Sequence, residues 1–176
     1  FVSMAEGGER NPNAGVVVPW EAVNPDYQQV ICDHDCTDFY VRPRYQMDHA
    51  VHKGIHPPAG MRGVWTAQQS QRITIREQDG LPHGIQQRGL LLKTGWQYQL
   101  RLVMKGEGQL VTVVLGDQTW EIQSVSSDWE TYETTLRVGV GEENGRLTIT
   151  FSNAATLWIA RASLMPSNHV HGFRAD

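Results

Sequence analysis

The stretch "QYQLRLVMK", Gln97–Lys105, decides the fold class of this chain. Its residues alternate between two sets, apolar Tyr98, Leu100, Leu102 and Met104 on one side and Gln97, Gln99, Arg101 and Val103 on the other. Successive side chains of a strand point to opposite faces of a sheet. The alternation therefore predicts a strand with one face in a core.

Three other stretches show the same period of two. They are "QSQRITIRE" (69–77), "ETYETTLRV" (130–138) and "RLTITFS" (146–152), and their predicted inward residues are Ile73, Ile75, Tyr132, Leu136, Val138, Leu147, Ile149 and Phe151. Turn segments rich in Gly, Pro, Asp and Asn separate these stretches. About eight strands after residue 60 leave no room for crossover helices, which predicts an all-β, antiparallel sandwich or barrel.

The first 60 residues follow a different pattern. "GVVVPW" (15–20) is a plausible strand, whereas residues 24–60 mix Pro, Asp, His and Tyr without a period. We expect a long irregular loop over 24–60, and a loop of that length in a compact domain is usually functional or poorly ordered.

Length and charge narrow the classes of function. A chain of 176 residues fits one domain, and a formal charge of −4 provides no basic field for a phosphate backbone, so we expect no nucleic-acid partner. No apolar run approaches the roughly 18 residues that span a bilayer, and we expect no membrane partner. A start at Phe1 suggests a chain cut from something longer. Localisation stays open, with an extracellular one favoured.

Two clusters of possible metal ligands occur near the N-terminus. "CDHDC" contains Cys32, His34 and Cys36, and "HAVHKGIH" contains His49, His52 and His56. These residue types bind zinc, but the spacings match no paired structural zinc motif. The alternative is a local disulfide, or two free thiols, beside solvated histidines. We predict no metal and no cofactor, and keep a metal-dependent enzyme as an alternative.

Nothing in the chain indicates catalysis by paired carboxylates. Glu77, Glu121, Glu130 and Glu133 stand at outward strand positions or beside turns, where a solvated carboxylate is expected. No nucleophile elbow, phosphate-binding loop or dinucleotide fingerprint occurs. The chain alone is therefore predicted not to be an enzyme.

The outward sides of the strands are rich in long polar side chains. If Ile73, Ile75, Ile85, Tyr98 and Leu100 face the core, one opposite side is expected to hold Arg72, Thr74, Arg76, Gln86, Arg88, Gln97, Gln99 and Arg101. Arg and Gln suit the paired hydroxyls of a sugar, and aromatic rings stack on its apolar face. The alternative is an ordinary polar outer face of an antiparallel sheet.

Five of the six tryptophans fall into two groups by position. Trp129 and Trp158 are predicted to face the core, the latter together with Ala160, Ala162 and Leu164. We predict that Trp65, Trp96 and Trp120 lie at strand ends or in turns, where an aromatic ring is more easily exposed. The predicted carbohydrate-binding residues are Trp65, Trp96, Trp120, Tyr40, Tyr45, Arg72, Gln86, Arg88, Gln99 and Arg101.

Five segments in order carry a resemblance to a known family. They are "QSQRITI", "HGIQQRGLLLKTGWQYQLRLVMKG", "WETYETTLRV", "GRLTITF" and "LWIARASLMP". In that order they resemble the jelly-roll carbohydrate-binding modules of the family 4 and 9 kind, over roughly residues 60–166. The resemblance implies a jelly roll over residues 1–166, with a polysaccharide or oligosaccharide as ligand.

The tail "SLMPSNHVHGFRAD" is similar to the point in family 51 type α-L-arabinofuranosidases where a jelly roll ends and the catalytic (β/α)8 barrel resumes. This implies that residues 167–176 are a linker toward an absent downstream catalytic domain in the same polypeptide. Related modules often carry acidic calcium ligands in the last strand, where this chain has Ala160 and Arg161. A calcium ion at that position would lack its ligands.

Two functions of different classes follow. The first is a non-catalytic module that holds a polysaccharide-degrading enzyme on plant-type glycans. The second is a structural jelly roll that packs on a catalytic barrel without a ligand of its own.

Overall fold

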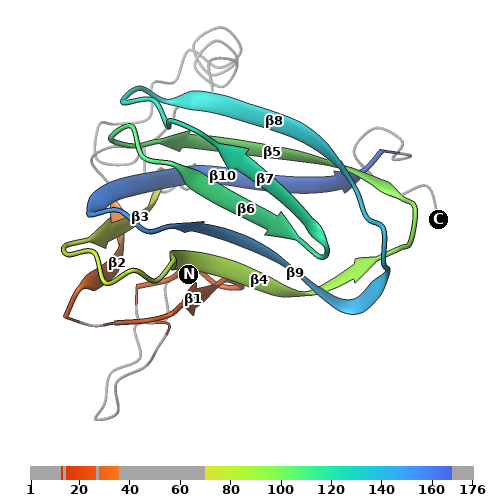
Figure 1. Ribbon diagram of the computed structural model, residues 1–176, viewed down its shortest axis with the longest axis horizontal. Helices are drawn as coiled ribbons and strands as arrows, with labels where there is room; N and C mark the ends of the chain where they lie inside the picture. The colour runs from red at the N-terminus through yellow and green to blue at the C-terminus, as the bar shows by residue number, and fades with distance from the viewer. Residues whose placement is uncertain (1–12, 14, 27, 36–69, 168–176) are drawn as a thin grey trace, which may run out of the picture.

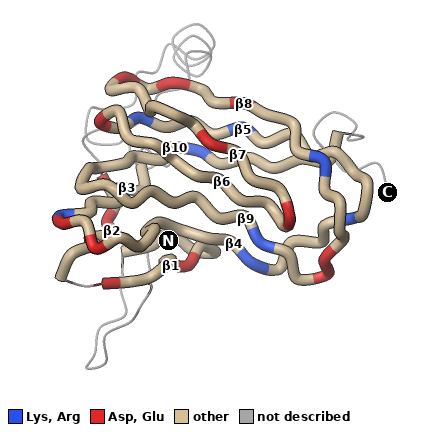
Figure 2. The backbone as a smooth tube through the Cα atoms, viewed as in Figure 1, with Lys and Arg blue, Asp and Glu red and all other residues tan. Residues whose placement is uncertain are grey.

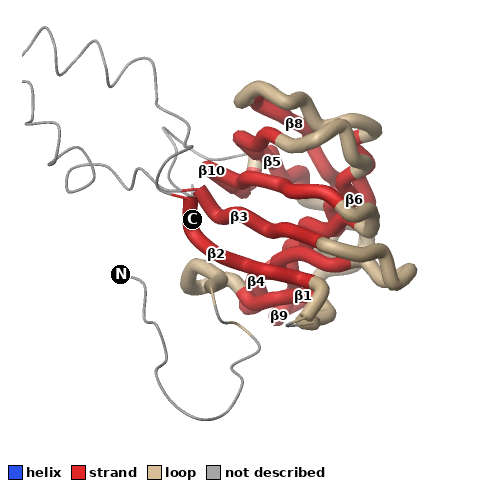
Figure 3. The backbone as a smooth tube through the Cα atoms, turned by 90° about the vertical axis from the view of Figure 1, so that its left-hand side faces the viewer, coloured by secondary structure: helices blue, strands red, loops and turns tan. Residues whose placement is uncertain are grey.

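The computed structural model describes residues 13, 15–26, 28–35 and 70–167, which form ten β-strands joined by turns (Figure 1). The strands are β1 (Glu21–Val23), β2 (Val30–Asp35), β3 (Ser70–Ile75), β4 (His83–Leu92), β5 (Gln97–Lys105), β6 (Val111–Leu115), β7 (Gln118–Ile122), β8 (Glu130–Arg137), β9 (Glu142–Phe151) and β10 (Ala155–Pro166). None of the described residues is helical, as Figure 3 shows.

The strands form two five-stranded antiparallel sheets that pack face to face (Figure 1 and Figure 3). Sheet A has the order β1-β4-β9-β6-β7, and sheet B has the order β2-β3-β10-β5-β8. The prediction of an all-β antiparallel sandwich is confirmed. Eight of the ten strands follow residue 60, as the turn spacing predicted.

The core lies between the sheets and is built from the predicted inward positions. Sheet B contributes Ile73 and Leu100, and sheet A contributes Ile85 and Ile149, each at most 1% exposed. Burial of one such side chain contributes about 1.5–3 kcal/mol. Tyr98 is also buried, and its hydroxyl accepts a hydrogen bond from the Lys93 amide at 2.9 Å, which satisfies its polar end.

Two expectations for the N-terminal part are wrong. Residues 15–20 form no strand, because local turns use their amides: Val16 N donates to Asn13 O at 3.0 Å and Trp20 N to Val17 O at 2.8 Å. Pro19 adds no donor to a ladder. The expected loop over 24–60 contains β2, which pairs with β3 through partners such as Cys32 and Ile73. An apolar Ile31 at an outward position and a polar His34 at an inward one hid the period of this short strand. Residues 36–60 lie outside the described part.

The last strand, β10, occupies the centre of sheet B between β3 and β5. Its pairing with β5 shifts at one point: Ile159 pairs with Met104, and Arg161 pairs with the next residue, Val103. Ala160 is therefore one extra residue on β10, a β-bulge.

Candidate functional site

The outer face of sheet B brings together side chains from segments that are far apart in the sequence. One row crosses four strands through directly paired positions, Asp33 on β2, Arg72 on β3, Trp158 on β10 and Lys105 on β5. We call these four residues the tryptophan row. The row combines an aromatic ring with charged hydrogen-bonding groups, which are the two kinds of group that bind sugars.

Trp158 does not face the core, so the prediction for this residue is wrong. Its neighbours Leu157 and Ile159 are 0% and 6% exposed and point inward, which turns Trp158 to the outer face. The prediction took its parity from Leu164, which packs against the core, but the bulge at Ala160 reverses the parity between the two halves of β10. The large aliphatic residues on either side of Trp158 were the signal for its true direction.

Two aspartates fix Arg72 and Trp158 in place. Arg72 donates to both carboxylate oxygens of Asp33, from Nε at 2.8 Å and Nη2 at 2.5 Å, and from Nη1 to Asp35 at 3.1 Å. Asp35 also accepts from Trp158 Nε1 at 3.0 Å. Hydrogen bonding to Asp33 is the largest cause of a raised Arg72 pKa. The guanidinium and the indole are therefore preorganised through shared acceptors.

Lys105 lies between two tryptophans. Its ammonium is 4.5 Å from the centroid of the Trp158 ring and 5.7 Å from that of Trp129. Both distances are within the range of a cation–π interaction. Trp129 is absent from the core cluster, so the prediction that it faces the core is also wrong. The signal missed here was that Trp129 lies two residues before the outward Thr131.

Exposure limits where a ligand could lie on this face. The side chains of Arg72 and Asp33 are 36% and 38% exposed, and Trp158 and Lys105 are half-buried. Asp35 is 7% exposed. Val103, an outward residue of β5, is only 2% exposed, so the face is not open to solvent at that point.

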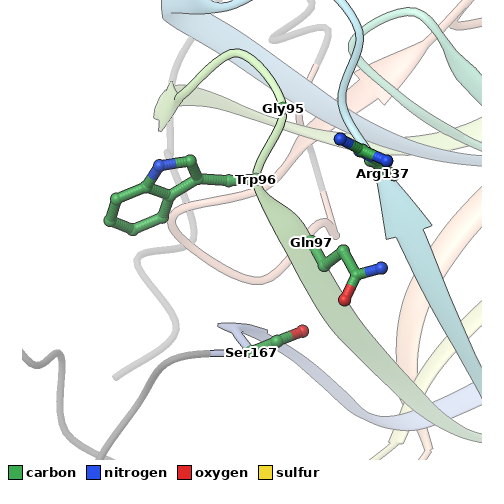
Figure 4. A pocket seen from close by; sticks show the side chains of 5 residues that line it. All are labelled: Gly95, Trp96, Gln97, Arg137 and Ser167. Atoms are coloured by element: carbon green, nitrogen blue, oxygen red, sulfur yellow. The ribbon is translucent and has the colours of Figure 1, made fainter.

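A pocket of about 440 Å³ lies where β5 begins and β8 ends. The described residues that line it are Gly95, Trp96, Gln97, Arg137 and Ser167, and we call it the Arg137 pocket. Figure 4 shows the side chains of Gln97 and Arg137 on one side of the β5 backbone and the Trp96 ring on the other. Gln97 and Arg137 are directly paired across β5 and β8, and Ser167 N donates to Gln97 O at 2.8 Å.

The predicted binding residues are divided between the two sheets. Arg72, Gln99 and Arg101 lie on the outer face of sheet B, where Arg101 Nε is 2.9 Å from Glu133. Trp65, Tyr40 and Tyr45 lie outside the described residues. The part that any of the ten plays in binding stays a prediction.

Gln86 and Arg88 do not share a side with the sheet B residues, which corrects that expectation. Both lie on β4 in sheet A, where Gln86 pairs with Glu21 and Arg88 Nε is 3.0 Å from the Glu21 carboxylate. The expectation assumed that strands consecutive in sequence lie in one sheet. The chain instead crosses from β3 in sheet B to β4 in sheet A.

Two of the predicted stacking tryptophans pack against the core. Trp120 lies inside β7, opposite the buried Val113, and not at a strand end or turn as expected. Trp96 precedes β5 as expected, and the Lys93 ammonium lies 4.2 Å from its ring centroid. Both are half-buried and contact the core cluster.

The possible metal ligands are only partly within the described chain. Burial raises the pKa of the Cys32 thiol to about 11, with a further contribution from Asp33, and this disfavours the thiolate that a metal needs. Cys32 is a free thiol. Across residues 13–35 and 70–167, with the gaps given above, no three His, Cys, Asp or Glu side chains gather as a metal group. Cys36, His49, His52 and His56 lie outside this part.

Among the described residues, no helical segment has the length and hydropathy that crossing a membrane requires.

The fold is that of the carbohydrate-binding-module-like β-sandwiches. A CBM4 structure has 15% sequence identity and a TM-score of 0.52, with 93% of this chain and 94% of that one covered. The CBM22-1 xylan-binding domain of Paenibacillus barcinonensis Xyn10C has 11% identity and a TM-score of 0.55, with 90% and 92% covered.

Part of an enzyme has the same fold. An arabinose-bound GH51 α-L-arabinofuranosidase, MgGH51, has 12% identity and a TM-score of 0.56; the match covers 85% of this chain but only 23% of that one. At these identities the likeness shows the fold alone. No family model and no curated protein matches the sequence.

Proposed function

We propose that this chain is a non-catalytic carbohydrate-binding module that holds a polysaccharide-degrading glycoside hydrolase on plant-type glycans such as hemicellulose. The observation that carries the proposal is the tryptophan row on the outer face of sheet B. The CBM4 and CBM22 structures support it by fold, since the latter is described as xylan-binding.

Each group of the row has a defined part in binding. The Trp158 indole provides an apolar ring face for a sugar, while Arg72 provides the two N–H donors that its hydrogen bonds to Asp33 and Asp35 leave over. A sugar that stacks on the ring face beside Lys105 displaces its ammonium, which then donates to a hydroxyl. Gln99 and Arg101 extend the donors along β5. Few rings are engaged, so we expect micromolar to millimolar dissociation constants.

The enzyme itself is proposed to lie in a downstream domain, with residues 167–176 as the linker. The GH51 enzyme, in which a domain of this fold makes up part of a longer chain, supports this arrangement. The module would raise the local concentration of the catalytic domain at the polymer.

Affinity electrophoresis and calorimetry of the folded domain against arabinoxylan, arabinan, xylan and β-glucan test the proposal. We expect retention on at least one polymer. Trp158→Ala should lower the affinity roughly tenfold or more, because stacking of one ring contributes about 1–3 kcal/mol by analogy with nucleobases.

Leu91→Ala is the control for this experiment. It truncates a 47% exposed apolar side chain on β4 of sheet A and should leave binding unchanged. Retention by Trp158→Ala equal to that of the unsubstituted protein would exclude the tryptophan row as the site. A folded domain that no polymer retains would favour the structural role on a catalytic barrel.

A further inference from the structure

The outer face of sheet B is basic, although the whole chain has a formal charge of −4. Figure 2 shows basic residues along β5 and β10 and at the end of β8. The described basic residues at outward positions of this sheet are Arg72, Arg101, Lys105, Arg137 and Arg161, and the acidic ones are Asp33, Asp35 and Glu133. The face therefore has an excess of positive charge.

All three acidic residues are already paired. Asp33 and Asp35 contact Arg72, and Glu133 contacts Arg101. Neither Arg137 nor Arg161 forms an ion pair with any residue in the described part of the chain. Arg137 is the one of these two that lines a pocket.

The Arg137 pocket offers hydrogen-bond donors and no described acidic side chain. The guanidinium of Arg137, the side-chain amide of Gln97 and the hydroxyl of Ser167 are its polar side chains. A guanidinium can donate two parallel hydrogen bonds to a carboxylate, and it keeps its charge at any physiological pH. The Lys93 ammonium lies over the ring of Trp96, on the other side of β5 from Arg137, so Arg137 is the positive charge among the residues that line the pocket.

The pocket and the tryptophan row lie along one strand. Gln97 and Lys105 are the two ends of β5, roughly 26 Å apart at the rise of a strand. Val103 of β5 is covered between them, but the neighbouring outward positions Arg101 on β5 and Thr131 on β8 are exposed. A polymer that passes beside Val103 on the β8 side could therefore reach both, whereas a single sugar could not.

We propose that the Arg137 pocket binds the carboxylate of a uronic acid carried by the glycan whose neutral rings lie on the tryptophan row. This proposal rests on the proposed function, because it assigns one more group of the same ligand. It makes the preferred substrate class an acidic, and not a neutral, plant polysaccharide.

The test compares a glucuronic-acid-substituted xylan with the same polymer after reduction of its carboxyl groups to alcohols. The unsubstituted protein should bind the acidic form roughly tenfold more tightly, and added salt should diminish the preference. Arg137→Gln should bind both forms equally. Arg146→Gln removes the same charge from an exposed position on β9 of sheet A and should keep the preference.

Three results would overturn the proposal. Equal binding of both polymers by the unsubstituted protein would do so, and so would a preference retained by Arg137→Gln. Tighter binding of a sulfated form of the polymer would assign the pocket to sulfate esters. The proposed function survives these results if Trp158→Ala still binds the carboxyl-reduced polymer more weakly than the unsubstituted protein does. Binding to no polymer at all would overturn both proposals together.

Discussion

At the residue scale, Asp35 connects the guanidinium and the indole of the tryptophan row. One of its carboxylate oxygens accepts from both Arg72 and Trp158, from strands that are neighbours only in the folded sheet. Its burial makes these hydrogen bonds more important than those of an exposed carboxylate, because water cannot replace a lost partner.

Asp35→Ala should therefore destabilise the domain by about 1–3 kcal/mol, since the Trp158 Nε1 donor loses its acceptor. Urea unfolding measures the effect. Glu133→Ala is the comparison, because it breaks an ion pair with Arg101 in which both side chains are more than half exposed, and it should cost less than about 1 kcal/mol. Equal losses for the two variants would contradict the special position of Asp35.

Cys32 gives a prediction on reactivity and pH. Its thiol has a pKa of about 11 in the fold against an ordinary value of 9.0, so at pH 8 the thiolate population is lower by roughly a hundredfold. In a Cys36→Ser background, iodoacetamide should label the folded protein correspondingly more slowly than the urea-unfolded protein, as mass spectrometry can measure.

The same shift has a defined sign for stability. The folded state holds the thiol proton more tightly than the unfolded state, so the Cys32 contribution is complete below pH 9 and is lost as the pH rises from 9 to 11. The unfolding free energy of the Cys36→Ser protein should therefore fall between pH 9 and pH 11 relative to that of the same protein with Cys32→Ala, which has no thiol to titrate. Rapid labelling at pH 8 or a constant difference would contradict the raised pKa.

At the element scale, the bulge in β10 determines which way its side chains point. The alternation of apolar and polar residues is unbroken in β3, β5, β8 and β9, and it predicted the inward residues of these strands correctly. It failed for Trp158 because Ala160 adds one residue that the sequence does not mark. It failed for β2 because, in a strand of only six residues, the outward Ile31 is apolar and the inward His34 is polar, which breaks the alternation.

Deletion of Ala160 should be tolerated, because Arg161 would then follow Ile159 in the continuous register that Val103 and Met104 already define. Cooperative unfolding and an unchanged β-type circular dichroism spectrum would confirm this. Deletion of Ser163 is the control, since it would turn Leu164 from the core to the outer face and should cost about 2 kcal/mol or more. Equal tolerance of both deletions would show that the bulge does not set the register.

At the scale of the whole molecule, the sequence predicted the class of fold better than it predicted which residues share the outer face of sheet B. Alternation and turn spacing are local, and they indicated an antiparallel sandwich. The assignment of strands to sheets is not local: β3 and β4 are consecutive yet lie in different sheets, which separated Gln86 and Arg88 from Arg72. Lys105 and Arg72 pair with Trp158 from the two sides of β10, and Asp33 joins the row only through its pairing with Arg72.

Because β10 is the last strand in the sequence and the central strand of sheet B, the tryptophan row can form only late in synthesis and folding. A nascent polypeptide that has emerged only through β9 contains every strand of sheet A, but the middle of sheet B is still missing. Trp158 and Asp35 are 123 residues apart, so their contact waits for slow, long-range closure. Only a domain that has been synthesised through β10 and has closed sheet B can therefore carry out the glycan binding that we propose for this face.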